Sequence, residues 1–198
     1  MGRLQELNMH EGWIYEALVS TFTDGEPHAT PIGVWTDDLT TLHMEIFDSS
    51  RTLNGLLDTK YFAANFPNDV SAFHVALFHP DLLSFEPAPT IPAPLLCGAS
   101  ATVELALSEA TPAKDRVRVT GSVVGARASE GLRLINRADG LLVESLILAT
   151  RMEYLDDAAV RRSLAENYRV IRKVAPGSKS ERAMTELMRD IGTRTQPS

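Results

Sequence analysis

The feature that most constrains the fold is a change in the spacing of hydrophobic residues about two-thirds of the way along the 198-residue chain. Up to about residue 128, short segments alternate apolar and polar residues or collect β-branched and aromatic residues, which is typical of β-strands. From about Ser129, apolar residues recur at helical spacing, in segments separated by Asp156-Asp157 and by Pro176-Gly177. Strands followed by helices predict a mainly β protein with C-terminal helices.

Turn residues, capping residues and prolines set the element boundaries. Asp24-Gly25 is a turn dipeptide, so the strands on either side of it are predicted to form a hairpin. Asp48-Ser49-Ser50 offers capping side chains for a short helix at 51–57, and the prolines between Pro80 and Pro94 indicate a loop. The predicted strands cover 13–22, 28–35, 41–47, 61–65, 101–107 and 115–124, with a strand or helix at 71–77. The predicted helices cover 129–151, 158–174 and about 178–191.

Composition excludes several classes of protein. A net charge of −7 without a lysine–arginine stripe would repel the phosphates of nucleic acids, and no apolar run approaches the ~20 residues that span a membrane. Residues 1–11 show no signal peptide and the single cysteine, Cys97, rules out an internal disulfide, so we expect a cytoplasmic protein. Cys97 has no basic or histidine neighbour, which favours a small buried or strand-edge residue over a nucleophile.

Ser49-Ser50-Arg51-Thr52 is the segment with the clearest chemical potential. It combines hydroxyl groups, a guanidinium group and the expected start of a helix, where unpaired backbone N–H groups and the positive end of the helix dipole attract anions. Arg51 can bind a phosphate through two hydrogen bonds, and a hydroxyl of Ser50 or Thr52 can add another. The alternative is that the serines only cap the helix while Arg51 points into water.

Thr30-Pro31-Ile32-Gly33-Val34 is the second candidate segment. Proline cannot donate a hydrogen bond to a neighbouring strand, so it marks a sheet edge or an irregular stretch. Gly33 allows another group to approach the backbone closely. A flat heteroaromatic ring can rest against such a strand and accept hydrogen bonds from its free amides. The alternative is an ordinary β-bulge after the hairpin.

Other polar residues favour structural roles. Asn136-Arg137 and Glu144 lie within the apolar helical segment, and we expect ion pairs between helices or across a dimer interface there rather than substrate binding. The five histidines are scattered without the spacing of metal ligands, so no metal site is predicted.

Five segments together resemble a known family. GWIYEALVSTF, ATPIGVW, SSRTLNGLL and YFAANFPND follow one another in the first part of the chain, and INRADGLLVESLILATR occupies 135–151. Their order resembles the flavin reductase-like FMN split barrels, and within them the uncharacterised family catalogued as domain of unknown function 447. Thr30 replaces a small residue that the family carries before the proline. Gly55 interrupts an expected Asn-Leu pair, which leaves the role of Asn54 open.

The resemblance implies an FMN-binding split β-barrel over residues 1–128. A helical C-terminal section at 129–192 would pack on the barrel or on the dimer partner, and 193–198 would form a flexible tail. FMN would bind without a covalent bond at the interface of a homodimer. The implied contacts are a ring bordered by Thr30, Pro31, Ile32, Gly33 and Val34, a phosphate held by Ser49, Ser50, Arg51 and Thr52, and further polar contacts from Asn54, Asn65 and Asn68.

The implied activity is that of a flavin-dependent oxidoreductase acting on a small molecule. FMN would carry out the redox chemistry while the protein positions it, which agrees with the lack of an evident acid–base pair in the sequence. The alternatives are a non-enzymatic FMN carrier or electron-transfer module, and a flavin-free scaffold. The residues identify neither a catalytic group nor the substrate or electron donor.

Overall fold

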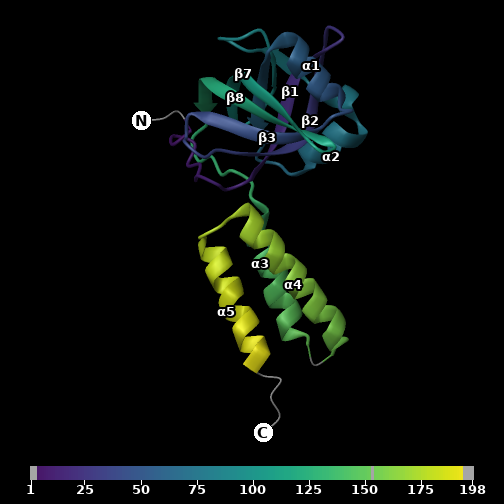
Figure 1. Cartoon of the computed structure of the whole chain (residues 1–198), viewed down its shortest axis with the longest axis vertical. Helices are drawn as coiled ribbons and strands as arrows, with labels where there is room; N and C mark the ends of the chain where they lie inside the picture. The colour runs from purple at the N-terminus through teal and green to yellow at the C-terminus, as the bar shows by residue number, and fades with distance from the viewer. Residues whose placement is uncertain (1–3, 153, 194–198) are drawn as a thin grey trace. The chain divides into compact units, whose positions relative to one another are not determined.

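The computed structural model describes residues 4–152 and 154–193, and the chain divides into two compact units (Figure 1). Residues 1–11 and 15–135 belong to the first, which we call the barrel unit, and residues 12–14 and 136–198 belong to the second, the helical unit. Each unit has its own hydrophobic core and is described separately below.

Six antiparallel strands close the barrel in the order β1-β2-β3-β8-β7-β4. This arrangement confirms the prediction of a mainly β protein with C-terminal helices. The barrel unit also contains helices α1 (Arg51–Thr59) and α2 (Ser71–Phe78), the 3₁₀ turn η1 (Pro80–Leu82) and a separate hairpin of β5 (Phe85–Pro87) and β6 (Pro94–Leu96). The barrel strands are β1 (Tyr15–Thr23), β2 (Glu26–Trp35), β3 (Thr41–Phe47), β4 (Tyr61–Phe66), β7 (Ala101–Ala113) and β8 (Arg116–Ala128).

The β1–β2 hairpin forms where the turn dipeptide predicts it. Asp24 and Gly25 have φ angles of 55° and 82°, the positive values that a two-residue hairpin turn of the primed type requires. Thr23 and Glu26 pair directly across this turn, and the register continues without a break to Tyr15 and Val34.

Alternate residues of each strand fill the barrel. Leu105 pairs with Phe62 across β7 and β4, and a Cβ atom added to Gly121 of β8 would lie 2.6 Å from the Phe62 ring. Val19 of β1 faces the same side as Phe62, because it pairs with Ala64 two residues further along β4. Every second residue of β1 from Val19 onward therefore points inward, toward the end of the barrel where α1 packs.

A second hydrophobic cluster covers the outer face of β1 and β4. Leu18, Ala76 and Leu96 form its buried part, and α2 and the β5–β6 hairpin contribute these residues together with β1. Segment 71–77, for which a strand and a helix were both open, is thus helical. The prediction that 80–94 is mostly loop misses η1 and β5, because strands of three residues leave no periodic signal. Cys97 directly follows β6 and is exposed, so the expected strand-edge position is confirmed but burial is not.

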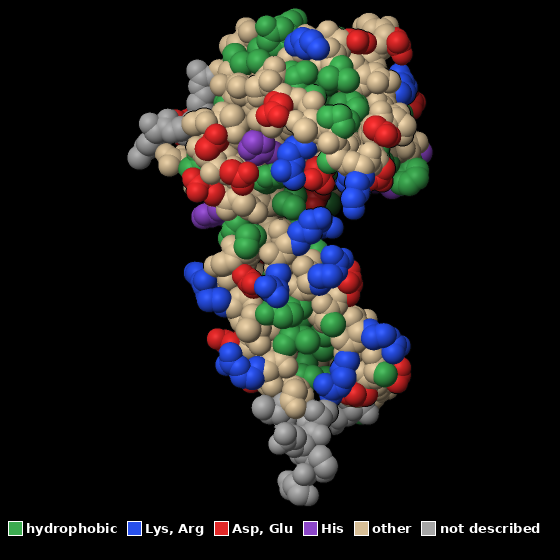
Figure 2. All heavy atoms as spheres, in the orientation of Figure 1, with side chains coloured by type: hydrophobic (Ala, Val, Ile, Leu, Met, Phe, Trp, Pro, Cys, Tyr) green, Lys and Arg blue, Asp and Glu red, His purple; other side chains and the backbone are tan. Residues whose placement is uncertain are grey.

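Three helices form the helical unit: α3 (Arg137–Thr150), α4 (Asp157–Val174) and α5 (Lys179–Thr193). Leu164 and Ile171 of α4 and Met184 of α5 are fully buried in its core. Hydrophobic side chains also reach the surface between α4 and α5 (Figure 2). The α4 and α5 boundaries confirm the predicted helices, with Asp156 and Ser178 as capping residues whose side chains accept backbone N–H bonds. Residues 194–198, most of the expected tail, lie outside the described residues.

The predicted helix at 129–151 is wrong over its first turns. Gly131 has a φ of +75°, and the chain from 129 to 136 forms no helix. Asn136 explains the start at Arg137, because its side-chain oxygen accepts the Ala138 N–H at 2.8 Å and caps α3. Its amide nitrogen donates to the carbonyl oxygens of Ile14 and Val174, both at 2.8 Å. Asn136 is therefore a cap and an anchor rather than part of a polar pair within a helix, and Glu144 is exposed.

Among the described residues, no helix combines the length and hydropathy that crossing a membrane requires.

Candidate functional site

Most of β2 has a free edge. Glu26 to Val34 pair with β1, whereas pairing with β3 is confined to Val34 and Trp35. Within 4–152 and 154–193 no third strand pairs with β2. The backbone groups on one side of residues 26–33 therefore lack a strand partner, and the barrel is split between β2 and β3 at this point.

The hairpin turn determines which backbone groups face this edge. Thr23 and Glu26 flank a two-residue turn and form a hydrogen-bonded pair, and such pairs alternate along an antiparallel ladder with pairs whose backbone groups point outward. The register thus implies that the outward residues of β2 are Pro27, Ala29, Pro31 and Gly33. Proline has no N–H to leave unpaired, so its presence at two of these positions fits a free edge.

The predicted segment 30–34 lies along the free edge, but only part of it presents backbone groups there. Pro31 offers its carbonyl oxygen and Gly33 both backbone groups, whereas Thr30 and Ile32 turn theirs toward β1. Val34 is fully buried and the other four residues are half-buried. The alternative of a β-bulge is wrong, because the register between β1 and β2 is unbroken.

The start of α1 presents unpaired hydrogen-bond donors. Ser50 caps the helix by accepting the Thr52 N–H at 3.2 Å, and its carbonyl oxygen accepts the Asn54 N–H. The backbone N–H groups of Arg51 and Leu53 have no partner among the described residues. Thr52 is buried, with 1% of its surface exposed, and the first turn contains no acidic residue. This end of the helix is therefore suited to an anion.

Arg51 stands over the end of β1 with most of its donors unused. Its Nη2 lies 3.4 Å from the Thr23 hydroxyl and 3.9 Å from the Asp24 carboxylate. Both ionic side chains are largely exposed, at 68% and 93%, so this contact contributes little to stability. The guanidinium group therefore remains available to a ligand.

Close packing against β1 fixes the position of α1. A Cβ atom added to Gly55 would lie 2.5 Å from the Phe22 carbonyl oxygen and 2.8 Å from the side chains of Thr21 and Thr23. Thr59, at the other end of the helix, donates to a backbone carbonyl and lies 3.1 Å from the Thr21 hydroxyl. Only glycine permits α1 to pack this closely against β1. This packing explains why Gly55 interrupts the Asn-Leu pair expected from the family.

His28 is a site residue that the sequence prediction missed. It pairs with Thr21 and so points to the side of the sheet on which α1 packs, where its side chain is half-buried. Burial is the larger cause that lowers the pKa of His28, and the charge of the Arg51 guanidinium group lowers it further. The hairpin turn could have located part of this arrangement, since two residues along each strand from the Thr23–Glu26 pair bring His28 opposite Thr21.

The remaining predicted residues separate into buried and exposed ones. Asn65 is fully buried, and its amide nitrogen donates to the Leu18 carbonyl oxygen at 2.8 Å and to the Ser20 hydroxyl at 2.9 Å. Its oxygen accepts the Leu96 N–H at 2.9 Å. Both donor positions of the amide are thus used inside the protein. Ser49, Asn54 and Asn68 are exposed and make no side-chain hydrogen bond with any described residue.

A separate pocket of about 220 Å³ lies where the β5–β6 hairpin meets the ends of β7 and β8. Arg127 and Glu86 line it and form an ion pair at 3.3 Å. The hydroxyl of Thr102, another lining residue, has no hydrogen-bond partner. None of the predicted site residues lines this pocket. In the described part of the chain no cluster of three or more His, Cys, Asp and Glu side chains is suited to a metal ion.

Solved structures with the same fold include several flavoproteins. An FMN-bound protein from Methanosarcina mazei is 21% identical over 94% of this chain and 98% of its own, with a TM-score of 0.56. An FMN-binding protein from Thermus thermophilus, solved with p-hydroxybenzaldehyde, is 23% identical over 60% of this chain and 73% of its own, with a TM-score of 0.53. The Streptomyces globisporus NADH:FAD oxidoreductase SgcE6 is 18% identical over 62% of this chain and 81% of its own, with a TM-score of 0.54. The fold is therefore that of the flavin reductase-like split barrels.

Family models match both units of the chain. The N-terminal domain of a protein family of unknown function, DUF447, matches residues 15–130, and the second DUF447 model matches residues 136–190. The Methanosarcina protein is described as a member of the same family. The chain therefore belongs to the DUF447 family of proteins of unknown function.

Proposed function

We propose that the barrel unit binds FMN, with the phosphate at the start of α1 and the ring along the free edge of β2. The observation that carries the proposal is the set of unused donors in one helical turn: the N–H groups of Arg51 and Leu53 and the Arg51 guanidinium group. A phosphate dianion needs several donors and a positive potential, and this turn offers both. Structures of this fold solved with FMN support the assignment.

The free edge of β2 fits the polar rim of a flavin ring. That rim carries both acceptors and a donor, and Gly33 offers an N–H and a carbonyl group side by side with the carbonyl of Pro31. A residue with a side chain at position 33 would hold a flat ring further from the backbone. Asn65 is not among the proposed flavin contacts, because its amide is already hydrogen-bonded inside the protein. The backbone groups of Thr30 and Ile32 are not among them either, because they face β1.

We further propose a flavin-dependent oxidoreductase that acts on a small molecule. When bound, FMN supplies the redox chemistry, and the residues of this chain bind it, orient it and restrict access to it. Neighbours of the same fold that are flavin reductases support this reading. The proposal assigns the side chains of the site to binding and orienting the flavin.

Removing the Arg51 side chain tests the phosphate site. Arg51→Ala is expected to raise the Kd for FMN about 10- to 100-fold, because a charge-assisted hydrogen bond contributes about 1.5–3 kcal/mol. The measurement is a titration followed by quenching of flavin fluorescence. Arg127→Ala is the matched control, since Arg127 is an exposed arginine of the same unit that lines the separate pocket, and its Kd should change less than about 2-fold. A wild type without FMN affinity, or equal Kd values for both variants, would refute the site.

Anaerobic mixing of the FMN-loaded protein with NADH or NADPH tests the oxidoreductase. The flavin band near 450 nm (roughly, as for any oxidised flavin) is expected to bleach with at least one of the two donors, faster than free FMN does at the same concentration. If dithionite reduces the bound flavin while both nicotinamides leave it oxidised, the carrier or electron-transfer alternative is favoured.

The lowered pKa of His28 predicts a pH-dependent stability. The unfolded chain binds a proton at this histidine below pH ~6.5, whereas the folded protein resists protonation until a lower pH. The contribution of a neutral His28 to stability is therefore complete above pH ~6.5 and lost as the pH falls toward the folded-state pKa. We expect the wild type to lose more unfolding free energy than His28→Gln between pH 7.5 and 5.5, measured by urea unfolding without FMN. A difference that does not change with pH would contradict this.

A further inference from the structure

A run of small residues leaves the separate pocket open. Residues 98–102 read Gly-Ala-Ser-Ala-Thr, and none of these side chains is large enough to fill the space beside Leu96 and Arg127. Gly98 has a φ of +77°, which allows the turn between β6 and β7. The pocket measures about 220 Å³, whereas one water molecule needs roughly 10–15 Å³ of such space, so a small organic molecule can enter it.

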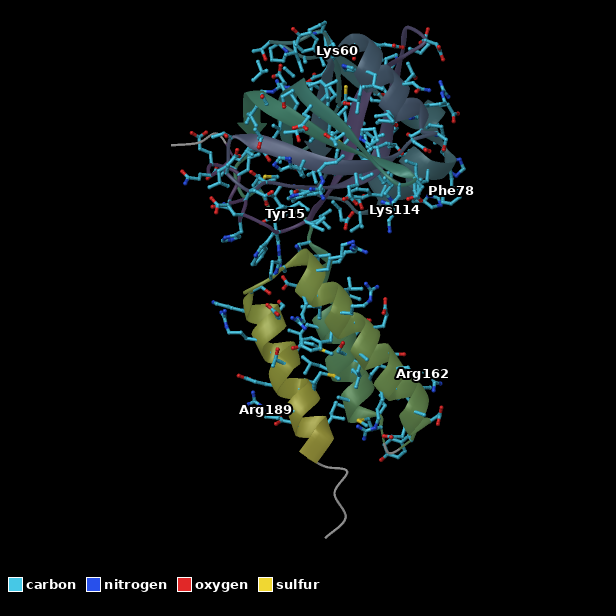
Figure 3. The ribbon with its side chains drawn as sticks, in the orientation of Figure 1. Tyr15, Lys60, Phe78, Lys114, Arg162 and Arg189 are labelled. Atoms are coloured by element: carbon cyan, nitrogen blue, oxygen red, sulfur yellow. The ribbon has the colours of Figure 1, made fainter. Side chains whose placement is uncertain are left out.

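The pocket is separate from the proposed flavin site. Thr102, which lines it, pairs with Asn65 of β4. Asn65 pairs in turn with Leu18 of β1, and Leu18 pairs with Pro31 of β2. Three strand spacings along the sheet, about 14 Å, therefore lie between Thr102 and the free edge of β2. Lys114 lies in the turn at one end of β7 and β8 (Figure 3), and the pocket lies at the other end of these strands.

The Thr102 hydroxyl is a buried polar group that the fold leaves without a partner. Only 5% of Thr102 is exposed, and its oxygen has no hydrogen-bond partner among the described residues. Burying a hydroxyl without a hydrogen bond costs free energy, and a ligand in the pocket can recover it by supplying the bond. Valine would fill the same space without this cost, so packing alone does not require threonine at this position.

Arg127 and Glu86 offer opposite hydrogen-bonding groups to the same pocket. Their ion pair, at 3.3 Å, joins one guanidinium nitrogen to one carboxylate oxygen, and neither side chain makes another hydrogen bond with a described residue. The guanidinium group thus keeps donors free, and the carboxylate keeps an acceptor free. About half of each side chain is exposed, at 51% and 53%, so the pair is weak enough to rearrange around a ligand.

This combination of groups indicates the class of ligand. A carboxylate would be attracted by Arg127 but repelled by Glu86, and an ammonium group would meet the reverse. A primary carboxamide carries an acceptor and a donor next to each other and has no net charge, so it can bind both side chains at once. Leu96, Ala99 and Ala101 form an apolar part of the pocket against which the rest of a small molecule can pack.

We propose that this pocket binds a small uncharged carboxamide. The carboxamide oxygen accepts from the Arg127 guanidinium group and the Thr102 hydroxyl, and its NH2 group donates to the Glu86 carboxylate. The inference does not depend on flavin binding and adds a second binding site to the barrel unit. The pocket is smaller than the roughly 300–1,000 Å³ of drug-sized sites, so we expect a fragment-sized ligand with an affinity in the millimolar range.

Three probes of one shape test the ligand class: benzamide, benzoate and benzylamine. A titration of the full chain followed by ¹H–¹⁵N chemical shifts measures each Kd and locates the site. Benzamide is expected to move the signals of 98–102 and 127–129, with a Kd at least about 3-fold below those of benzoate and benzylamine. Glu86→Gln removes the charge that repels benzoate and should lower the benzoate Kd about 2- to 5-fold.

Two variants test the side chains that hold the carboxamide. Thr102→Val should raise the benzamide Kd about 3- to 10-fold without lowering the urea midpoint, because the hydroxyl has no partner in the free protein. Arg127→Ala should raise the Kd at least about 5-fold. Arg118→Ala is the matched control, since Arg118 is also an exposed arginine of β8 with one ion pair, to Glu45, but does not line the pocket. Its benzamide Kd should equal that of the wild type.

A wild type in which benzamide moves none of these signals, up to its solubility limit, would overturn the proposal. So would a benzoate Kd below that of benzamide, or a Thr102→Val variant that binds benzamide as the wild type does. The titrations are repeated with saturating FMN, and the benzamide Kd should stay the same. Failure of benzamide with intact FMN binding refutes only the carboxamide site, and the reverse result refutes only the flavin site.

Discussion

Replacing Gly55 with alanine is expected to destabilise the barrel unit by about 3 kcal/mol, the upper range for adding a methyl group to a well-packed site. The new Cβ would lie 2.5 Å from the Phe22 carbonyl oxygen, and backbone cannot move aside as the end of a flexible side chain can. The threonine side chains on either side, from Thr21 and Thr23, block the remaining directions. Since α1 must then move away from β1, the same variant should also weaken FMN binding.

Gly140→Ala is the matched control for this prediction. Gly140 also lies in a helix, but apart from its chain neighbours and the adjacent backbone of its own helix, no atom lies within 4 Å of the position of an added Cβ. The change should stabilise the helical unit by about 0.5–1 kcal/mol, because alanine has the higher helix propensity. Urea unfolding followed by tryptophan fluorescence can separate the units, since Trp35 lies in the barrel unit and Trp13 in the helical unit. If both variants changed stability in the same direction, helix propensity rather than the clash would govern position 55.

Local signals in the sequence were sufficient to predict the elements whose conformation is set by a few consecutive residues. The alternation in 41–47 and the Asp24-Gly25 turn predicted β3 and the first hairpin, because pleating and a positive-φ turn are properties of a few consecutive residues. Capping residues located the start of α1 at Arg51 in the same way. The same residues predicted a helix start with unpaired N–H groups, and the anion site proposed there stays a prediction.

Backbone conformation and long-range packing together explain what the sequence could not reveal. The spacing of apolar residues continued through 129–136, but Gly131 with its positive φ and the cap at Asn136 delay the helix to Arg137. The free edge of β2 depends on how far β3 pairs with it, and no local pattern records that extent. In the sequence Gly55 only interrupts a motif, whereas the structure shows that β1 packs too closely for a side chain at this position.

Asn65→Leu is expected to be the most destabilising single change, at about 3–5 kcal/mol, because each buried polar group left without a partner costs about 1–3 kcal/mol. Leucine has a similar shape but offers no hydrogen bonds. The Leu18 carbonyl, the Ser20 hydroxyl and the Leu96 N–H would each lose a partner in a region with no access to water. Because these groups come from β1 and β6, the change should loosen the β5–β6 hairpin from the barrel.

The same position decides between two roles for its amide. The family resemblance implies a contact to FMN, which predicts that Asn65→Ala weakens FMN binding at least 10-fold while the protein stays as stable as the wild type. The buried hydrogen bonds predict the reverse: a lower urea midpoint, and a Kd for FMN within about 2-fold of the wild type when it is measured without urea, where the variant is folded.

Ser20→Ala separates the contributions further, since it removes one of the three bonds to Asn65 and the bond from Ser20 to the Pro94 carbonyl. It should lower the urea midpoint less than Asn65→Leu, because the amide then keeps its bonds to Leu18 and Leu96. An unchanged midpoint for Asn65→Leu would show that these buried bonds do not hold the hairpin, and the amide would return to the list of flavin contacts.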